Sequence, residues 1–132
     1  MYMYEMKEEF FTGIEEIDNQ HKVLFEIADK IYYLLKDEFA IDKYDKIVEL
    51  IEELKDYTSF HFATEEAYME KIKYKRMFTQ KIDHNNFVQK LEDVDLREID
   101  ENQEETILQM LEFVNEWLIE HILKKDKFIG VE

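Results

Sequence analysis

The sequence contains no cysteine, no proline and only two glycines. Without cysteine, a disulfide framework is excluded, and so are the thiolate sites of zinc ribbons, iron–sulfur clusters and copper(I) carriers. Apolar runs such as 32–35 fall far short of the roughly 20 residues that a membrane-spanning helix needs. Residues 1–10 carry acidic charge where a secretory signal has a basic start and an apolar run. We therefore expect a cytoplasmic protein.

Basic residues are scarce beside acidic ones, with 17 lysines and arginines against 33 aspartates and glutamates, and the formal net charge is −16. Such a chain repels the phosphates of nucleic acids and of anionic lipid head groups. We therefore expect neither nucleic acid nor a membrane surface as a partner, and we interpret the charge as the solvated surface of helices. No partner protein is identifiable from the sequence.

The chain has 132 residues, the usual length of one domain, and shows no internal repeat, low-complexity tract or linker. Apolar residues recur at steps of three and four in four segments, which predicts helices over about 18–37, 42–73, 76–97 and 103–124. No segment has the alternation of a strand. We predict a single all-α domain over 1–132, folded as an up-down-up-down four-helix bundle with an N-terminal arm.

The apolar stripes of these helices define the predicted core. Asp18 and Asp42 are predicted to cap the first two helices, and Lys36 lies near the end of the first helix, where the helix dipole favours positive charge. In chain order the stripes are His21, Leu24, Phe25, Ala28, Ile31 and Leu35; Ile47, Leu50, Ile51, Leu54, Thr58, His61, Glu65, Met69 and Ile72; Gln80, His84, Phe87, Val88, Leu91 and Val94; and Ile107, Leu111, Val114, Leu118 and His121.

All four histidines converge at one end of this topology. The start of the first helix, the end of the second, the start of the third and the end of the fourth lie together in an up-down-up-down bundle. With a rise of about 1.5 Å per residue, the following side chains fall within roughly two or three turns of that end: His21, His61, Glu65, His84 and His121. A single histidine on an apolar face is more often a core residue than a metal ligand, but four that converge favour a metal site.

Burying Glu65 among imidazoles is costly unless a cation compensates for it. Asp126, five residues past His121 and close to the expected end of the fourth helix, is a further candidate ligand, because a bend there can direct its carboxylate to the same cluster. Two carboxylates can bridge two ions, and imidazole with carboxylate suits iron, zinc or manganese. No histidine follows a glutamate by three residues, which argues against a ferritin-like di-iron site.

Three groups of residues resemble the motifs of the hemerythrin family and together span nearly the whole chain. Residues 12–14 (TGI) and 17–25 (IDNQHKVLF) are similar to its entry to the first helix, 61–69 (HFATEEAYM) to its second motif, and 117–122 (WLIEHI) with Asp126 to its last. The resemblance implies a non-haem centre of two iron ions, joined by an oxo or hydroxo bridge, that binds dioxygen reversibly. Zinc or manganese are the alternative metals.

The resemblance also implies a role for each ligand. His21 and His61 would bind one iron, and His84 and His121 would bind the other. Glu65 and Asp126 would bridge the two ions. The family usually supplies a further histidine to the second iron, and Gln80 stands at that position here. A glutamine amide is a weaker donor than imidazole, so Gln80 is a weak or absent ligand and the second iron is expected to be loosely capped, water-bound or incompletely loaded. By the same resemblance Leu118 would line an apolar dioxygen pocket, with ordinary core packing as the alternative.

We interpret the aromatic and methionine residues near the ligands as core packing, namely Trp117, Phe25, Phe62 and Met69. The arm 12–17 could shield the metal end or be an ordinary ordered terminus. We predict a protein that stores, delivers or senses dioxygen and is not an enzyme. Two alternatives stay open: a di-iron enzyme acting on peroxide, nitric oxide or ferrous iron, which Gln80 would favour, and a metal store or a structural bundle with a single zinc.

Overall fold

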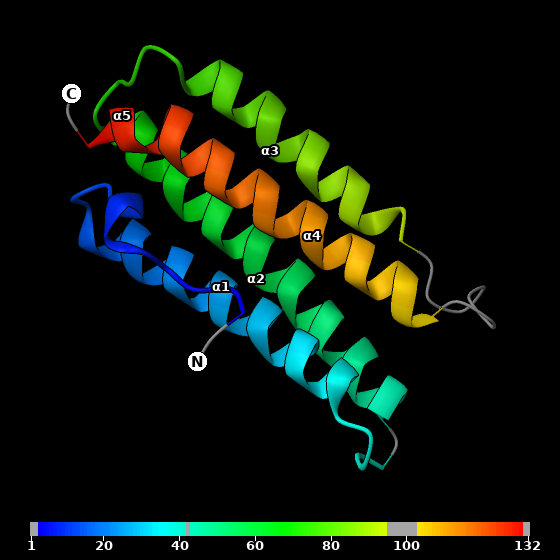
Figure 1. The fold of residues 1–132 in the computed structure, drawn as a ribbon. Helices are drawn as coiled ribbons and strands as arrows, with labels where there is room; N and C mark the ends of the chain where they lie inside the picture. Colours follow the sequence, from blue (N-terminus) through cyan, green and yellow to red (C-terminus); the bar gives the residue numbers. More distant parts are fainter. Residues whose placement is uncertain (1–2, 42, 95–102, 131–132) are drawn as a thin grey trace.

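Each amphipathic segment forms a long helix, and the helices lie side by side with the chain running alternately up and down (Figure 1). The computed structural model describes residues 3–41, 43–94 and 103–130, and within these ranges there is no strand. The predicted all-α four-helix bundle is confirmed. α1 packs against α2 and α4, and α2 packs also against α3. The four helices are α1 (Glu15–Lys36), α2 (Lys43–Lys71), α3 (Met77–Glu92) and α4 (Gln103–His121).

The helix ends differ from the predicted ones by a few residues where they can be compared. α1 begins at Glu15 instead of 18, and its last turn contains the predicted basic residue Lys36. Asp42, the predicted cap of the second helix, lies outside the described residues, and so does the predicted end of the third helix at 97. Two short elements flank the bundle, a 3-10 turn η1 (Glu8–Phe10) in the arm and the helix α5 (Lys127–Ile129) at the C-terminal end.

The predicted stripes form the core. Ile72 is an exception, because it lies beyond the end of α2 and is 37% exposed. Leu50, Val88 and Val94 are only partly buried at the edge of the core. All other apolar members are buried, namely Leu24, Phe25, Ala28, Ile31, Leu35, Ile47, Ile51, Leu54, Met69, Phe87, Leu91, Ile107, Leu111, Val114 and Leu118.

The prediction that Asp18 caps the first helix is wrong. The helix begins earlier, with Ile14 at the N-cap position and no side-chain cap. The buried carboxylate of Asp18 instead accepts hydrogen bonds from the Thr12 backbone N–H (2.7 Å), the Thr12 hydroxyl (2.8 Å) and the Gly13 N–H (3.1 Å). Gly13 has a φ of +90°, a conformation that glycine adopts readily. Asp18 therefore fastens the arm to α1 and does not cap the helix.

The N-terminal arm packs on the bundle from the middle of α1 to the end that carries the histidines (Figure 1). The buried ring of Phe10 stacks on Phe25 of α1 with ring centroids 5.9 Å apart. Near the C-terminal end, a Cβ atom at Gly130 would overlap the carbonyl oxygen of Thr12, so glycine permits the close approach of the C-terminal segment to the arm. The arm thus covers the helix ends that carry the candidate ligands.

Replacing Asp18 with alanine is expected to lower the free energy of unfolding of the metal-free protein by about 1–3 kcal/mol, because three donors of the arm lose their acceptor. Urea denaturation measures the difference. Asp45→Ala on α2 is the matched control, because Asp45 is exposed. Equal stability of the two variants would contradict the role assigned to Asp18.

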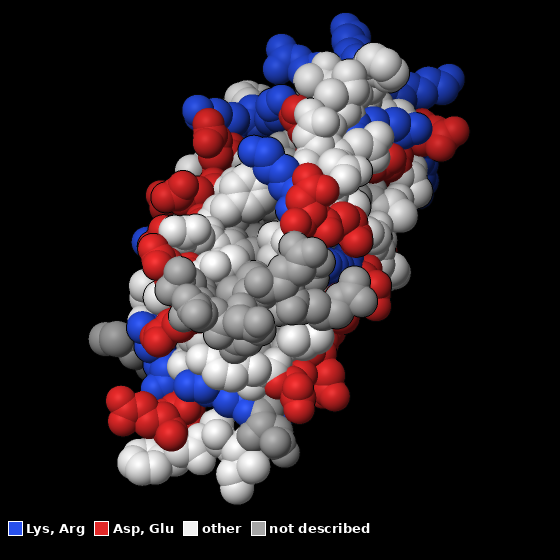
Figure 2. All heavy atoms as spheres, turned by 90° about the vertical axis from the view of Figure 1, so that its right-hand side faces the viewer, with Lys and Arg blue, Asp and Glu red and all other residues white. Residues whose placement is uncertain are grey.

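Acidic and basic side chains alternate with uncharged ones over the face shown in Figure 2. On this face the charged side chains therefore do not form one block of a single sign. None of the helices described here combines the length and the apolar character needed to span a membrane.

Candidate metal centre

The six predicted ligands lie together inside one end of the bundle, and none is more than 6% exposed. They come from every long helix and from the segment after α4. They form two groups that share both carboxylates: His21, His61, Glu65 and Asp126 in one, and Glu65, His84, His121 and Asp126 in the other. Within each group the candidate ligand atoms all lie within 4.8 Å of one another. The structure therefore brings together the residues that the sequence singled out.

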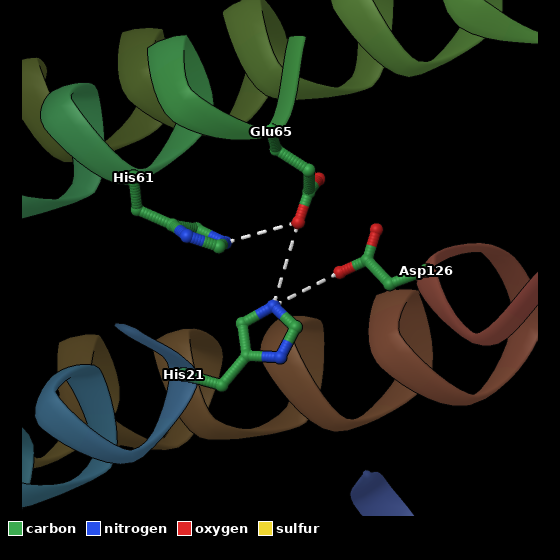
Figure 3. A group of neighbouring side chains, drawn as sticks. All are labelled: His21, His61, Glu65 and Asp126. Atoms are coloured by element: carbon green, nitrogen blue, oxygen red, sulfur yellow. Dashed lines mark ion pairs between the residues drawn. The ribbon is translucent and has the colours of Figure 1, made fainter. Parts of the chain in front are cut away.

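Glu65 divides its two carboxylate oxygens between the two groups. Its Oε2 atom lies 3.1 Å from Nε2 of His61 and 3.5 Å from Nε2 of His21, and its Oε1 atom lies 3.0 Å from Nε2 of His84. Figure 3 shows the rings of His61 and His21 both directed at the same oxygen of Glu65. A carboxylate that faces two histidine groups with different oxygens has the arrangement of a bridging ligand.

Asp126 divides its oxygens in the same way. Its Oδ2 atom lies 3.2 Å from Nε2 of His21, on the side opposite His61 in Figure 3, and its Oδ1 atom lies 3.3 Å from Nε2 of His121. The side chain is 2% exposed. The two groups are therefore linked twice, once through each carboxylate.

The position of Asp126 depends on a π-helical turn. We predicted that a bend at the end of the fourth helix would direct this carboxylate inward, but the chain stays helical and widens into η3 (Ile122–Asp126), where the N–H of Lys127 donates to the carbonyl of Ile122. In an α-helix, residues five apart are rotated by about 140° from each other. A π turn places them on the same side, which brings Asp126 onto the side of His121.

Gln80 lies one turn before His84 on α3 and is 1% exposed. Its Nε2 atom donates a hydrogen bond to Oδ1 of Asp126 (3.1 Å). Its Oε1 atom is buried and has no hydrogen-bond partner among the described residues. In this orientation the amide nitrogen of Gln80 holds a candidate bridging carboxylate.

Two further side chains, which the sequence prediction missed, orient ligand rings. Oε1 of Gln20 lies 2.8 Å from Nδ1 of His61. This oxygen only accepts, so Nδ1 carries the proton and the lone pair of Nε2 faces the centre. Oε2 of Glu66 lies 2.9 Å from Nδ1 of His84 and has the same effect. Gln20 directly precedes the predicted ligand His21, and Glu66 directly follows the predicted ligand Glu65. This adjacency is the one sign in the sequence that could have pointed to them.

The second group also reaches a carboxylate nearer the surface. Oδ2 of Asp83 lies 3.9 Å from Nδ1 of His121, too far for a hydrogen bond, and forms a close ion pair with Lys125. Asp83, His121 and Lys125 all line a surface cavity of about 250 Å³. His121 is thus the candidate ligand whose ring borders this opening.

Charge compensation within the cluster is reflected in its pKa values. Burial alone would lower the pKa of His21, but Asp126 and Glu65 outweigh it and raise the pKa from 6.5 to about 9. Burial would raise the pKa of Glu65, yet the surrounding imidazoles, His61 first, hold it well below its usual value. In the same way burial lowers and Glu65 raises the pKa of His84, with a net increase. In the metal-free site, protons on the histidines therefore compensate the charge of the buried carboxylates, as metal cations could.

Several buried polar atoms of the cluster have no hydrogen-bond partner in the described part of the chain. They are both ring nitrogens of His21, Nε2 of His84 and of His121, and both oxygens of Glu65. Buried polar groups in folded proteins are nearly always hydrogen-bonded, so a group of exceptions within one cluster of side chains needs an explanation. Imidazole and carboxylate donors with this spacing suit a pair of first-row transition-metal ions. The residues present fit such a centre.

The remaining predicted residues pack around the ligands. Leu118 is 3% exposed and belongs to the main core. Phe62 stacks on the ring of His84 at 3.9 Å, and Trp117 stacks on the ring of His121 at 4.3 Å. The two aromatic residues therefore pack against candidate ligands directly, which is more specific than the general core role that we predicted for them.

Comparisons with known proteins agree on one family. The family described as "Hemerythrin HHE cation binding domain" matches residues 12–129. A bacteriohemerythrin of Clostridium acetobutylicum is 52% identical over 125 residues, which are 95% of this chain and 97% of that protein. A bacteriohemerythrin of Methylococcus capsulatus is 32% identical, over 92% of this chain and 89% of that protein.

Solved structures agree with the sequences. The crystal structure of a leucine-to-alanine mutant of hemerythrin superposes with a TM-score of 0.84 at 26% identity. The match covers 99% of this chain and 97% of the other.

Proposed function

The chain belongs to the hemerythrin family, and from this premise we propose that it holds two iron ions between its helices and binds dioxygen there to store, deliver or sense it. The observation that carries the proposal is the double link between the two histidine groups, because Glu65 and Asp126 each face both groups with different oxygens. A pair of ferrous ions supplies the two electrons that dioxygen takes up on binding and returns on release. We propose no reaction on a further substrate, and therefore no enzyme activity.

The residues of the chain have distinct tasks in this proposal. His21 and His61 hold one iron and His84 and His121 the other, with Nε2 as the ligand atom in each ring. Gln20 and Glu66 keep the protons of two of these rings on Nδ1. The buried surroundings exclude water from the centre, which favours reversible binding over oxidation.

A second candidate, a di-iron enzyme acting on peroxide, nitric oxide or ferrous iron, is favoured by Gln80. Its amide nitrogen is engaged with Asp126, and its amide oxygen has no hydrogen-bond partner among the described residues. The iron held by His84 and His121 would then have a position open to water or to an added ligand. Turnover assays with each of the three substrates distinguish this candidate from a binding protein.

The decisive test is anaerobic reconstitution with ferrous iron. Metal per chain is counted first, and the visible spectrum is then followed through cycles of dioxygen addition and removal. We expect both sites to fill and a colour that appears and disappears reversibly. A colour that forms once and does not return would favour the enzyme, and incorporation of zinc in preference to iron would favour a structural bundle.

Metal uptake is expected to release protons at neutral pH. The pKa of His21 is about 9 in the metal-free fold and about 6.5 in the unfolded chain. His21 therefore stabilises the metal-free fold below about pH 6.5, and this contribution is lost as the pH rises toward 9. Over the same range metal affinity rises by about tenfold per pH unit for each displaced proton. Calorimetric titration with cobalt(II) in buffers of different ionisation enthalpy measures the release, and an affinity independent of pH would contradict it.

Leu118→Ala separates the two roles considered for this leucine. Truncation of a fully buried leucine is expected to cost about 2–5 kcal/mol of unfolding free energy in either case. If Leu118 also borders the bound dioxygen, the oxidation rate of the ferrous protein rises as well, because water enters more easily. Leu111→Ala, at a buried position two turns earlier in α4, is the control for stability alone. Equal oxidation rates in the two variants would favour core packing.

A further inference from the structure

The surface between α3 and α4 is hollowed by three adjoining cavities of about 250, 420 and 300 Å³. Neighbouring cavities share wall residues. Asp83 and Trp117 line both the first and the second, and Lys90 and Phe113 line both the second and the third. We call this continuous depression the α3–α4 trough. It begins at the ring of His121 and extends along the bundle away from the candidate metal centre.

Aromatic rings connect the trough to the centre. The ring of Trp117 lies 4.3 Å from that of His121 at an interplanar angle of 12°, and 4.2 Å from that of Phe87 at 25°. Two rings this close and nearly parallel to the indole cannot share one of its faces, so Trp117 lies between them. Phe87 in turn stacks on Phe113, 5.6 Å away.

Trp117 makes ring contacts toward both histidines of the second group. It stacks on His121 directly, and it lies 5.8 Å from Phe62, which stacks on His84. These are the histidines that share their half of the centre with Gln80. An electron that reaches Trp117 is therefore one or two ring contacts from that half.

We propose that the α3–α4 trough binds a reduced flavin and that Trp117 conducts its electrons to the centre, returning oxidised iron to the ferrous form. This inference rests on the proposed function, because it presupposes iron. Two ferric ions need one electron each, and a reduced flavin carries two that it can release singly. A nicotinamide transfers a hydride and would have to touch its acceptor, which the burial of the centre prevents.

The walls of the trough suit such a ligand. The cavities of about 300 and 420 Å³ fall in the size range of small-molecule sites, and their aromatic lining suits a planar heteroaromatic ring. Lys90 is exposed and lies with Nζ 5.0 Å from the ring centre of Phe113, which places a cation beside the aromatic lining for a flavin phosphate or for the reduced anion. Three basic and three acidic side chains line the trough, so the net charge of −16 of the whole chain is not concentrated there.

The electron balance is complete without a further reactant. One reduced flavin loses two electrons and two protons and becomes oxidised flavin, while two ferric ions each gain one electron. The protons pass to solvent at the open trough. No bond within the protein forms or breaks.

Binding can be tested without iron, because Trp117 is the only tryptophan and its fluorescence reports on the trough. Oxidised flavin mononucleotide added to the metal-free protein is expected to quench this fluorescence saturably. Lys90→Glu is expected to weaken binding about tenfold, whereas Lys46→Glu, an exposed change on α2, leaves it unchanged. Absence of saturable quenching, or equal losses in both variants, would overturn the proposal.

Electron transfer is tested with the ferric protein in stopped-flow reduction by reduced flavin mononucleotide. Trp117→Phe is expected to slow reduction by at least about tenfold after correction for the iron content of the variant and for its flavin affinity, both measured separately, the affinity by the fluorescence of the flavin. An unchanged rate would overturn the role of Trp117. If this variant does not retain iron, Lys90→Glu serves instead, and its reduction rate at low flavin must fall by the same factor as its affinity. If the protein does not bind iron, the flavin-binding experiment on the metal-free protein can still be carried out. The proposed function and the flavin proposal can therefore be disproved independently.

Discussion

Glu65→Gln is expected to abolish the retention of both metal ions. The carboxylate faces three imidazoles and is completely buried, so no neighbouring side chain can replace its charge. An amide has a single weakly donating oxygen and cannot serve both histidine groups. Metal analysis after reconstitution and desalting measures the loss.

The same variant is expected to destabilise the metal-free protein by about 3–5 kcal/mol, because protonated His21 loses a buried counter-charge. Glu70→Gln, at an exposed position five residues after Glu65 on α2, is the matched control. This variant should keep both metal ions and its stability. A Glu65→Gln protein that retains both ions would show that the double link through carboxylates is not what holds the centre.

Gln80→His is expected to strengthen metal binding in the half that contains His84 and His121 by at least about tenfold. The substitution adds an imidazole donor one turn before His84 and also frees Oδ1 of Asp126 from its hydrogen bond with the amide. In the wild type we therefore expect two phases of metal binding, the weaker belonging to this half. Competition with a chelator of known affinity resolves them.

The ferrous form of Gln80→His is expected to oxidise more slowly in air and to release dioxygen more reversibly than the wild type, because an open position on the second iron is filled. Gln89→His, on the exposed side of the same helix, controls for an added histidine that lies away from the centre. If wild type and Gln80→His behave identically in affinity, reversibility and oxidation, Gln80 has no influence on the chemistry.

The bundle was predictable because burial follows the spacing of apolar residues, and the ligands were found because they interrupt that spacing with polar groups. His61 and Glu65, for example, occupy stripe positions of α2 that apolar residues would otherwise fill, and both are buried. Up-down-up-down connectivity then fixes which helix ends meet. Sequence periodicity and topology were sufficient for this part of the site.

Other features depend on contacts between segments that periodicity does not describe. Asp18 resembles an N-cap in sequence, but its partners are set by how the arm returns over α1. Gln20 reaches His61 on a different helix, 41 residues away in the sequence. The π turn has no distinctive composition, since Ile122–Asp126 reads as an ordinary continuation of α4. Only the folded chain reveals these three.

The π turn also makes one short stretch of the chain sensitive to its length. Between His121 and Asp126, the side chains of Leu123 and Lys124 are exposed and can be exchanged freely. Adding one residue there would displace the carboxylate by a rotation of about 100°. Removing one would leave the carboxylate on the side of His121 only if the π turn tightened into an α-helical turn. Relatives and engineered variants can therefore differ in the composition of this segment, but the number of residues separating the two ligands must match the kind of helical turn that joins them.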